Sequence, residues 1–403
     1  MPYYQRAKQR TSYHAGGNRR RDSFNTNRGR GMKGRGQYID PAKFVKAAKP
    51  VTEEVYEPKH HFSDFAINER IKKNLADQGY ETPTPIQDQS IPAILDGKDL
   101  IGIANTGTGK TAAFGIPLIH KLLADRWEKA LIIAPTRELA QQIRVELNKI
   151  TKGGFVRTAL LIGGASMKYQ LKDLAKQPQL VIGTPGRIKD HLERETLKLS
   201  EFNNVVLDEV DRMLDMGFID DMRQILSAVN NKRQSLFFSA TMDERVKQLI
   251  ATFSNEPATV SVKTGDTSDN VHQDVIRYGH HSEKPDKLHD ALIEEAVKKV
   301  IIFEETQRDV ERLATELLDR GFATDSIHGG KSQGQRQRAL RRFKESEVDI
   351  LVATDVAARG IDVKDVTHVF NYSVPQTYED YTHRIGRAGR AGNVGYAYTF
   401  VQG

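Results

Sequence analysis

The sequence contains no cysteine, and its 403 residues include a single tryptophan. A chain without cysteine has no disulfide, no thiolate metal site and no cysteine nucleophile, and a reducing compartment is favoured. No apolar run in the sequence approaches the length of about 18 residues that a membrane-spanning helix needs. The N-terminus also shows no apolar stretch of the kind found in secretory signals, so we predict neither a membrane span nor a secretory signal.

Charge is distributed unevenly along the chain. The 60 Lys and Arg and the 53 Asp and Glu give a net charge of +7. The first 50 residues carry 13 basic and two acidic residues, a charge of +11, which leaves −4 for the other 353. This segment contains Arg-Gly repeats with scattered Tyr and Phe, and it has too few apolar residues to form a core. We predict a disordered tail and linker over residues 1–61, which either binds RNA nonspecifically or only solvates the chain.

Beyond residue 62, short apolar runs alternate with helical patterns. This alternation predicts an α/β fold with parallel sheets that are covered on both faces. A polar stretch over 257–270 separates two series, so we expect domains at 62–256 and 271–403 joined by a linker. A helix is predicted near 310–318, ending at Gly321. The expected strands lie at 100–104, 130–134, 158–162, 180–182, 205–207 and 235–238, and then at 275–278, 300–303, 349–352, 369–372 and 395–400.

Nearly every polar, glycine-containing motif follows directly after one of these apolar runs. Because ligands of open parallel sheets bind at the carboxyl ends of the strands, these motifs should gather at one edge of each sheet. The first is the segment 104–111, Ala-Asn-Thr-Gly-Thr-Gly-Lys-Thr, which has the pattern of a phosphate-binding loop. Its glycines allow backbone N–H groups to face phosphate, Lys110 supplies a positive charge, and Thr111 offers a hydroxyl to Mg²⁺. The alternative is a chance glycine-rich turn.

Two further motifs match this chemistry. Asp208 and Glu209 follow a strand, where an Asp can hold Mg²⁺ and a Glu can orient an attacking water. A pair of solvated acids is the alternative. The segment 383–390 in the second domain carries three arginines on a glycine-containing backbone. Such guanidinium groups suit a phosphoryl transition state, although a solvated basic turn or a simple RNA contact would look the same.

Taken in order, the motifs resemble those of the DEAD-box ATP-dependent RNA helicases over about residues 62–403. The resemblance implies two tandem RecA-like domains, ATP and Mg²⁺ as ligands, and RNA-stimulated ATP hydrolysis. The matching segments are Phe62, 79–87, 104–111, 135–140, 163–164, 184–187, 208–211, 239–241, 333–336, 354–362 and 383–390.

The resemblance also implies roles at the ATP site. Gln87 would read the adenine edge, Phe62 or Tyr80 would pack on the ring, and Asp362 would approach the ribose. The phosphates would be held by Ala104, Thr106, Gly107, Thr108, Gly109, Lys110 and Thr111. Catalysis would use Lys110, Asp208 and Glu209, with Mg²⁺ at Thr111 and Asp208, and Arg387 and Arg390 as arginine fingers. Asp211, Ser239, Thr241 and His383 would couple the ATP site to the RNA site.

RNA would lie across both domains and be held mainly through phosphates and 2′-hydroxyls, independently of its sequence. The implied contacts are Pro135, Thr136, Arg137, Gly163, Gly164, Thr184, Gly186, Arg187, Gln333, Arg336 and Thr354. Ribosome-assembly or RNA-decay proteins are candidate partners, and a cytoplasmic monomer is expected. An ATP-gated RNA clamp or scaffold with little unwinding would use the same residues. A DNA translocase of a related superfamily is disfavoured by Gln87 and Asp211.

Three features depart from the family pattern. The acidic motif reads Asp-Glu-Val-Asp, and we expect the packing around Val210 to adjust and activity to persist. Thr306-Gln307-Arg308 stands where the family varies, and we expect only a solvated helix start there. Family members usually continue into a final helix, so we also expect the sequence to be incomplete at its C-terminus.

Overall fold

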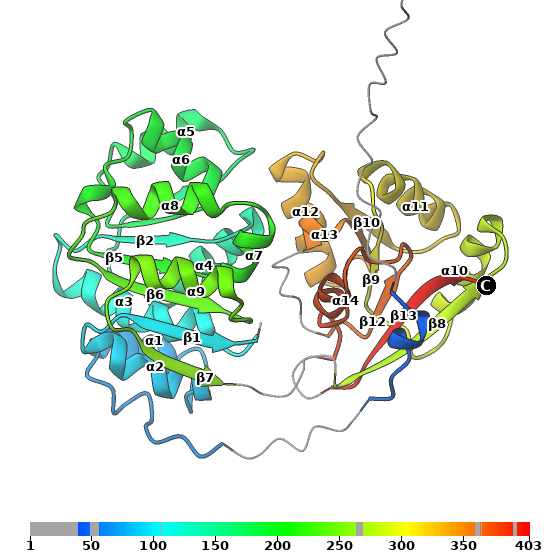
Figure 1. Cartoon of the computed structure of the whole chain (residues 1–403), viewed down its shortest axis with the longest axis horizontal. Coiled ribbons are helices and arrows are strands. Elements are labelled where there is room, and N and C mark those ends of the chain that lie inside the picture. The colour runs from blue at the N-terminus through cyan, green and yellow to red at the C-terminus, as the bar shows by residue number, and fades with distance from the viewer. Residues whose placement is uncertain are drawn as a thin grey trace, which may run out of the picture. The chain divides into compact units, whose positions relative to one another are not determined.

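The computed structural model describes residues 39–48, 56–105, 107–262, 269–358, 363, 365–389 and 393–403. Within these residues the chain forms two α/β domains, which we call domain 1 and domain 2 (Figure 1). Of the tail and linker predicted over residues 1–61, residues 1–38 and 49–55 lie outside the described residues. In the described part of the chain, no helix is both long and apolar enough to cross a membrane.

Domain 1 contains a seven-stranded parallel sheet with the order β3-β4-β2-β5-β6-β1-β7. Its strands are β1 Leu100–Ala104, β2 Ala130–Ile133, β3 Thr158–Leu161, β4 Leu180–Gly183, β5 Asn204–Leu207, β6 Gln234–Ser239 and β7 Ala258–Val262. Its helices are α1 Glu69–Ala76, α2 Pro85–Leu95, α3 Lys110–Ala124, α4 Arg137–Ile150, α5 Met167–Leu174, α6 Pro185–Glu193, α7 Val210–Asp215, α8 Ile219–Ala228 and α9 Glu244–Phe253.

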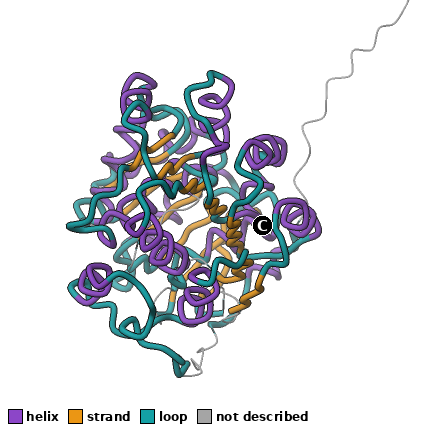
Figure 2. The backbone as a smooth tube through the Cα atoms, turned by 90° about the vertical axis from the view of Figure 1, so that its left-hand side faces the viewer, coloured by secondary structure: helices purple, strands orange, loops and turns teal. Residues whose placement is uncertain are grey.

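Each central strand of domain 1 is buried on both faces, as the continuous apolar runs predict. Ile132 and Val206 belong to one core with helices α1 to α4, whereas their neighbours Leu131 and Val205 belong to a second core with α6 to α9. Successive side chains of a strand point to opposite faces, so a run without alternation fills two cores at once. The result is a sheet between two helical layers (Figure 2).

Domain 2 contains a six-stranded parallel sheet with the order β10-β11-β9-β12-β13-β8. Its strands are β8 Val271–Tyr278, β9 Val300–Phe303, β10 Thr324–Ile327, β11 Ile350–Ala353, β12 His368–Asn371 and β13 Gly395–Gln402. Its helices are α10 Lys284–Leu292, α11 Gln307–Asp319, α12 Gln333–Lys344, α13 Asp355–Ala358 and α14 Tyr378–Ile385. The helix predicted near 310–318 is therefore confirmed as part of α11, and Thr306 caps its start.

The structure corrects two predicted boundaries. Residues 258–262 were expected in the interdomain linker, but they form β7, which pairs with β1 at the edge of the domain 1 sheet. Residues 39–48 were expected in the disordered tail and linker, but they include a short 3₁₀ helix, Pro41–Phe44. Phe44 is fully buried in a core of domain 2. In both cases a few apolar residues in a polar stretch find a partner far away in the sequence, which local composition does not reveal.

Candidate functional site

The phosphate-binding loop connects β1 to α3, as the sequence predicts. Gly107 and Gly109 have φ angles of +85° and +94°, in the left-handed region where glycine is favoured. Gly109 caps α3, so the free N–H groups of the first helical turn are available to an anion. The buried Lys110 donates from Nζ to the carbonyl oxygen of Ala104 at 2.9 Å. The loop therefore presents backbone donors and one ammonium group at a helix N-terminus.

The segment before α2 is fastened to this loop. The Gln87 side chain accepts a hydrogen bond from the Thr84 amide at 2.9 Å and donates to the Gly109 carbonyl at 3.1 Å. Thr84 Oγ1 also donates to the Thr108 carbonyl at 2.8 Å. Any side chain on Gly109 would collide with Gln87, since its Cβ would lie 2.4 Å from Nε2. Adenine recognition by Gln87 stays a prediction, while the structure shows Gln87 shaping the loop.

The two expected aromatic residues lie beside this segment. Phe62 is 4% exposed and belongs to the core of domain 1. Its ring meets the half-buried Tyr80 edge to face, with the ring centroids 5.8 Å apart. Tyr80 donates its hydroxyl proton to Glu146 of α4. Burial and this carboxylate both raise the pKa of the Tyr80 hydroxyl, so Tyr80 stays neutral.

Two carboxylates are buried side by side after β5. Burial raises the pKa of Asp208 to about 6, and the neighbouring Glu209 adds to the effect while Lys110 opposes it. Burial acts in the same direction on Glu209, but Arg212 and Lys110 outweigh it and hold the pKa of Glu209 below its usual value. Arg212 Nη1 lies 2.9 Å from Glu209 Oε2. Glu209 is thus an ionised acceptor, and Asp208 is a carboxylate without a full counter-charge.

The last acid of this motif is bonded to the segment after β6. Asp211 Oδ2 accepts hydrogen bonds from the Ala240 amide at 3.0 Å, the Thr241 amide at 2.8 Å and the Thr241 hydroxyl at 3.1 Å. The Asp211 amide donates to Ser239 Oγ at 3.3 Å. Four bonds therefore join α7, which begins beside Glu209, to the end of β6. Val210 is fully buried in the core that contains Leu207, so the departure at this position is accommodated by packing.

The other motifs of domain 1 lie at the carboxyl ends of the neighbouring strands β2, β3 and β4. Pro135 and Thr136 follow β2, and Thr136 caps α4 by accepting from the Leu139 amide at 3.2 Å. The Arg137 guanidinium lies over Gly163 and Gly164, where a Cβ would approach it to 3.1 Å and 2.2 Å. These two glycines therefore leave room for a cation. Beside them, Thr184 caps α6, Gly186 lies in its first turn, and Arg187 donates to the Ala165 carbonyl at 3.4 Å.

In domain 2, the arginine-containing segment begins on α14. Arg384 lies within hydrogen-bond distance of both oxygens of Asp355, with Nε–Oδ1 at 2.6 Å and Nη2–Oδ2 at 2.7 Å. It also donates to the Ser373 carbonyl at 2.7 Å. Asp355 follows Thr354 after β11, so this ion pair fixes α14 against the strand edge. His383 lies on α14, and Arg387 lies two residues after its end.

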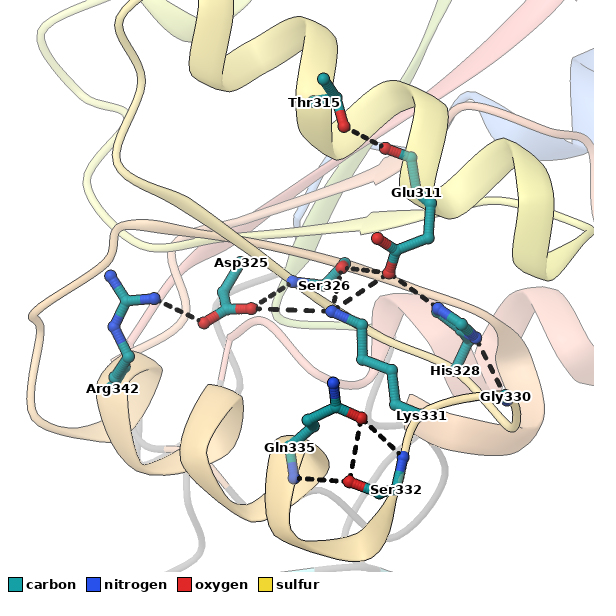
Figure 3. A network of polar contacts seen from close by, with 10 residues as sticks. All are labelled: Glu311, Thr315, Asp325, Ser326, His328, Gly330, Lys331, Ser332, Gln335 and Arg342. Atoms are coloured by element: carbon teal, nitrogen blue, oxygen red, sulfur yellow. Dashed lines mark hydrogen bonds and ion pairs between the residues drawn. The ribbon is translucent and has the colours of Figure 1, made fainter.

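Gln333 and Arg336 lie on α12, and a polar network fixes the loop that precedes this helix (Figure 3). Glu311 of α11 lies 2.7 Å from Ser326 Oγ, 2.7 Å from His328 Nε2 and 3.1 Å from Lys331 Nζ. Burial would raise the pKa of Glu311, but these partners lower it to about 2. His328 Nδ1 in turn accepts from the Gly330 amide at 3.1 Å. An ionised carboxylate on α11 therefore sets the loop geometry.

Family models match both domains of this chain. The model described as DEAD/DEAH box helicase matches residues 84–249, and the model described as Helicase conserved C-terminal domain matches residues 283–392. The ATP-dependent RNA helicase CshA of Listeria monocytogenes is 48% identical over 342 residues, which cover 85% of this chain and 66% of that protein. The DEAD-box ATP-dependent RNA helicase CshA of Geobacillus kaustophilus is 47% identical, and the match covers 73% of that protein. This chain belongs to the DEAD-box helicase family.

Solved structures of similar proteins support the same assignment. The structure of S. cerevisiae Dbp5 bound to RNA and ADP BeF3 has 27% sequence identity and a TM-score of 0.75, covering 85% of this chain and 89% of that one. The structure of Mss116p bound to ssRNA and AMP-PNP has 31% identity and a TM-score of 0.75, covering 85% and 74%. The family consists of enzymes that use ATP, and the two RecA-like domains predicted from the sequence are confirmed. This chain spans about two thirds of the length of its curated relatives.

The acidic site of this DEAD-box protein fits a magnesium ion that arrives with a nucleotide. Among the described residues, no group of three or more histidine and acidic side chains is arranged to bind a metal by itself. Asp208, which interacts electrostatically with Lys110, and Thr111, which directly follows Lys110, nevertheless each carry an oxygen that can bind such an ion. Mg²⁺ takes oxygen ligands and is usually held by one or two carboxylates together with substrate phosphates. The under-compensated charge of Asp208 is consistent with such an ion.

Three predicted residues, Thr106, Asp362 and Arg390, lie outside the described part of the chain. Sequence reasoning missed Arg212, and it included Asp355 and Arg384 only as members of motifs, without their ion pair. Each of the two ion pairs fixes a functional element. The pairing of Arg212 with Glu209 had a local signal, because Glu209 is the N-cap of α7 and lies three positions before Arg212. Asp355 and Arg384 are 29 positions apart, and no local pattern links them.

The loop network predicts a specific effect of Glu311→Gln. The substitution removes the charge that holds Lys331 and His328, so RNA affinity should fall about twofold to fivefold, in line with the loss of a partly exposed charge-assisted contact. ATP affinity should stay unchanged, because the ATP-site residues of domain 1 are elsewhere. Fluorescence anisotropy with labelled RNA measures this effect, and Asp319→Asn at the end of the same helix is the control. Equal RNA affinity of both variants would contradict the role of the network.

Proposed function

We propose that this protein hydrolyses ATP in an RNA-stimulated manner and uses the cycle to separate short RNA duplexes or remodel RNA–protein complexes. One observation supports this most directly: the acid pair Asp208 and Glu209 is joined through Asp211 to the Ser239–Thr241 segment. A change at the nucleotide can therefore shift a second loop at the same sheet edge. The names of the relatives and the motif order support the same reaction.

At the ATP site, the proposed roles follow from the geometry of domain 1. Lys110 and the N-terminus of α3 bind the β- and γ-phosphates, and Gln87 orients the adenine. Mg²⁺, held by Asp208 and Thr111 with the phosphates, would neutralise developing charge. Glu209, kept ionised by Arg212, accepts a hydrogen bond from the attacking water and orients it toward the γ-phosphate.

Domain 2 would supply the remaining groups. Arg387 and Arg390 place positive charge on the transferred phosphoryl group, and Asp362 contacts the ribose. The Arg384–Asp355 ion pair holds the helix that leads to these arginines, and His383 on this helix relays the state of the site. Since Lys110 and Glu209 lie in domain 1 and Arg387 in domain 2, ATP and RNA would complete the site by bringing the domains together.

RNA would bind along the strand ends of both domains. In domain 1 the Arg137 guanidinium over Gly163 and Gly164, together with the N-terminus of α6, offers donors to successive phosphates. In domain 2 the loop before α12, Arg336 and Thr354 offer the others. The Dbp5 and Mss116p structures contain RNA, which supports this assignment. We further propose that the protein acts as a cytoplasmic monomer on RNA in ribosome assembly or RNA decay.

Glu209→Gln should preserve ATP binding and abolish turnover. The amide still fills the site but no longer carries the charge that orients water, so the rate should fall about 10²- to 10⁴-fold. RNA-stimulated phosphate release and binding of a fluorescent ATP analogue measure the two effects, with Glu244→Gln on the exposed start of α9 as the control. RNA-stimulated hydrolysis within tenfold of the parent would contradict the proposed role. A strand-displacement assay in parallel distinguishes an unwinding enzyme from an ATP-gated clamp.

Deletion of residues 1–38 tests the proposed RNA binding by the tail, and it leaves the docked residues 39–48 in place. Each phosphate contact of a basic residue releases counterions, so the deletion should lower RNA affinity and flatten its dependence on salt. The control replaces the same residues with a Gly/Ser chain of equal length. If RNA affinity and its salt slope match the full chain, the tail only solvates the protein.

A further inference from the structure

One glutamine side chain of domain 1 closes the loop that contains Gly163 and Gly164. Gln170 lies on α5, the helix that follows this loop, and it is 4% exposed. Its amide nitrogen Nε2 donates to the Ile162 carbonyl at 3.1 Å and to the Ala165 carbonyl at 3.3 Å. These two carbonyls flank the glycine pair, so a single buried amide group fixes both ends of the loop.

The oxygen of the same amide group contacts α6. Because carbonyl oxygens only accept hydrogen bonds, the Gln170 nitrogen faces them and the Gln170 oxygen is left for another partner. That partner is His191, which is fully buried and places Nε2 3.3 Å from Gln170 Oε1. His191 lies four positions after Arg187, so both side chains lie on one face of α6. The contact joins α5 to α6, which lie side by side in domain 1 (Figure 1).

The protonation state of the histidine ring fits this contact. Burial, and to a smaller extent the positive charge of Arg187, lowers the pKa of the His191 imidazole, so the ring is neutral at neutral pH. A neutral ring that donates from Nε2 to Gln170 accepts at Nδ1, and the Thr196 hydroxyl lies 2.8 Å from Nδ1. Both ring nitrogens of His191 and the whole amide of Gln170 therefore have hydrogen-bond partners.

We propose that Gln170 and His191 are positioning residues for RNA binding. They hold the Gly163–Gly164 loop and the segment 184–187 at a fixed separation, so that the phosphates of one RNA strand can contact both. This inference rests on the proposed function, in which these two segments of domain 1 bind RNA. Gln170 and His191 themselves are buried and do not touch RNA.

One shared carbonyl connects the glutamine to a proposed RNA contact. The Ala165 carbonyl accepts from Gln170 Nε2 and also from Arg187 Nη1, the latter at 3.4 Å. When the amide of Gln170 is lost, the glycine loop and Arg187 are free to leave the geometry that binds RNA. Only the fraction of molecules in the competent geometry then binds, and the apparent RNA affinity falls by that fraction.

Gln170→Met tests the amide, because methionine fills a similar volume but donates no hydrogen bond. Two buried hydrogen bonds to the loop are lost, so RNA affinity should fall about fivefold to tenfold. Binding of an ATP analogue in the absence of RNA should stay unchanged. Fluorescence anisotropy with labelled RNA and titration with a fluorescent ATP analogue measure the two affinities.

Gln234→Met is the matched control. Gln234 is also buried, and its amide also donates to two main-chain carbonyls, those of Ile94 at 3.0 Å and Lys98 at 2.6 Å. However, Gln234 begins β6 and therefore lies at the amino ends of the strands, away from the proposed RNA contacts. RNA affinity should stay at the parent value in this variant. Equal RNA affinity of the two methionine variants would overturn the positioning role of Gln170.

Two substitutions of His191 separate positioning from packing. His191→Gln places an amide near the position of Nε2 and can restore the hydrogen bond, so RNA affinity should stay within about twofold of the parent. His191→Phe fills the volume of the ring without a nitrogen, so RNA affinity should fall about threefold to fivefold. The same anisotropy assay measures both. Equal RNA affinities of these two variants would overturn the role of His191.

Amide hydrogen exchange gives a readout that needs neither RNA nor ATP. In the ligand-free protein, the amides of residues 163–166 should exchange faster in Gln170→Met than in the parent, because the loop opens more easily. They should exchange at the parent rate in Gln234→Met. Unchanged exchange in Gln170→Met would overturn the inference. Absence of RNA binding by the parent, with exchange as expected, would instead overturn the proposed function and the link to RNA that rests on it.

Discussion

The burial of two adjacent carboxylates after β5 is the constraint on which the site depends. Ionised acids in a dry environment need positive partners, and the described part of domain 1 supplies Lys110 and Arg212. Arg212 forms an ion pair with Glu209. The raised pKa of Asp208 indicates that the charge of the Asp208 carboxylate is not fully balanced. A Mg²⁺ ion that binds together with the nucleotide would supply the missing positive charge. The same arrangement therefore explains the ionised Glu209 and agrees with the proposed Mg²⁺ site at Asp208.

Because the strands are parallel, the motifs that follow them lie at the same edge of the sheet as the buried acids. β1, β5 and β6 are neighbours in the sheet, so the phosphate-binding loop, the acids and the Ser239–Thr241 segment meet at one edge. Asp211 then bonds two of these motifs together. The glycines and arginines that we propose as RNA contacts follow β2, β3 and β4 along the same edge.

Much of this could be predicted from sequence, because buried parallel strands are continuous apolar runs and motifs follow their ends. All eleven predicted strands lie in the two sheets. β7 and β10 were missed because polar residues interrupt the apolar ones within Ala258–Val262 and Thr324–Ile327. Neither strand is therefore a continuous apolar run. The docking of Phe44 and the Arg384–Asp355 ion pair were missed because each joins residues that are distant in sequence. Their energies come from tertiary packing, which no local pattern encodes.

Coupling between ATP and RNA binding tests the account most directly. The affinity of the full chain for single-stranded RNA is measured with and without a nonhydrolysable ATP analogue, and the affinity for the analogue with and without RNA. Linkage requires both factors to be equal, and typical coupling corresponds to about 5- to 150-fold. We predict that each ligand tightens the other by one common factor in this range. Independent binding of RNA and analogue would contradict a site that is completed by both domains.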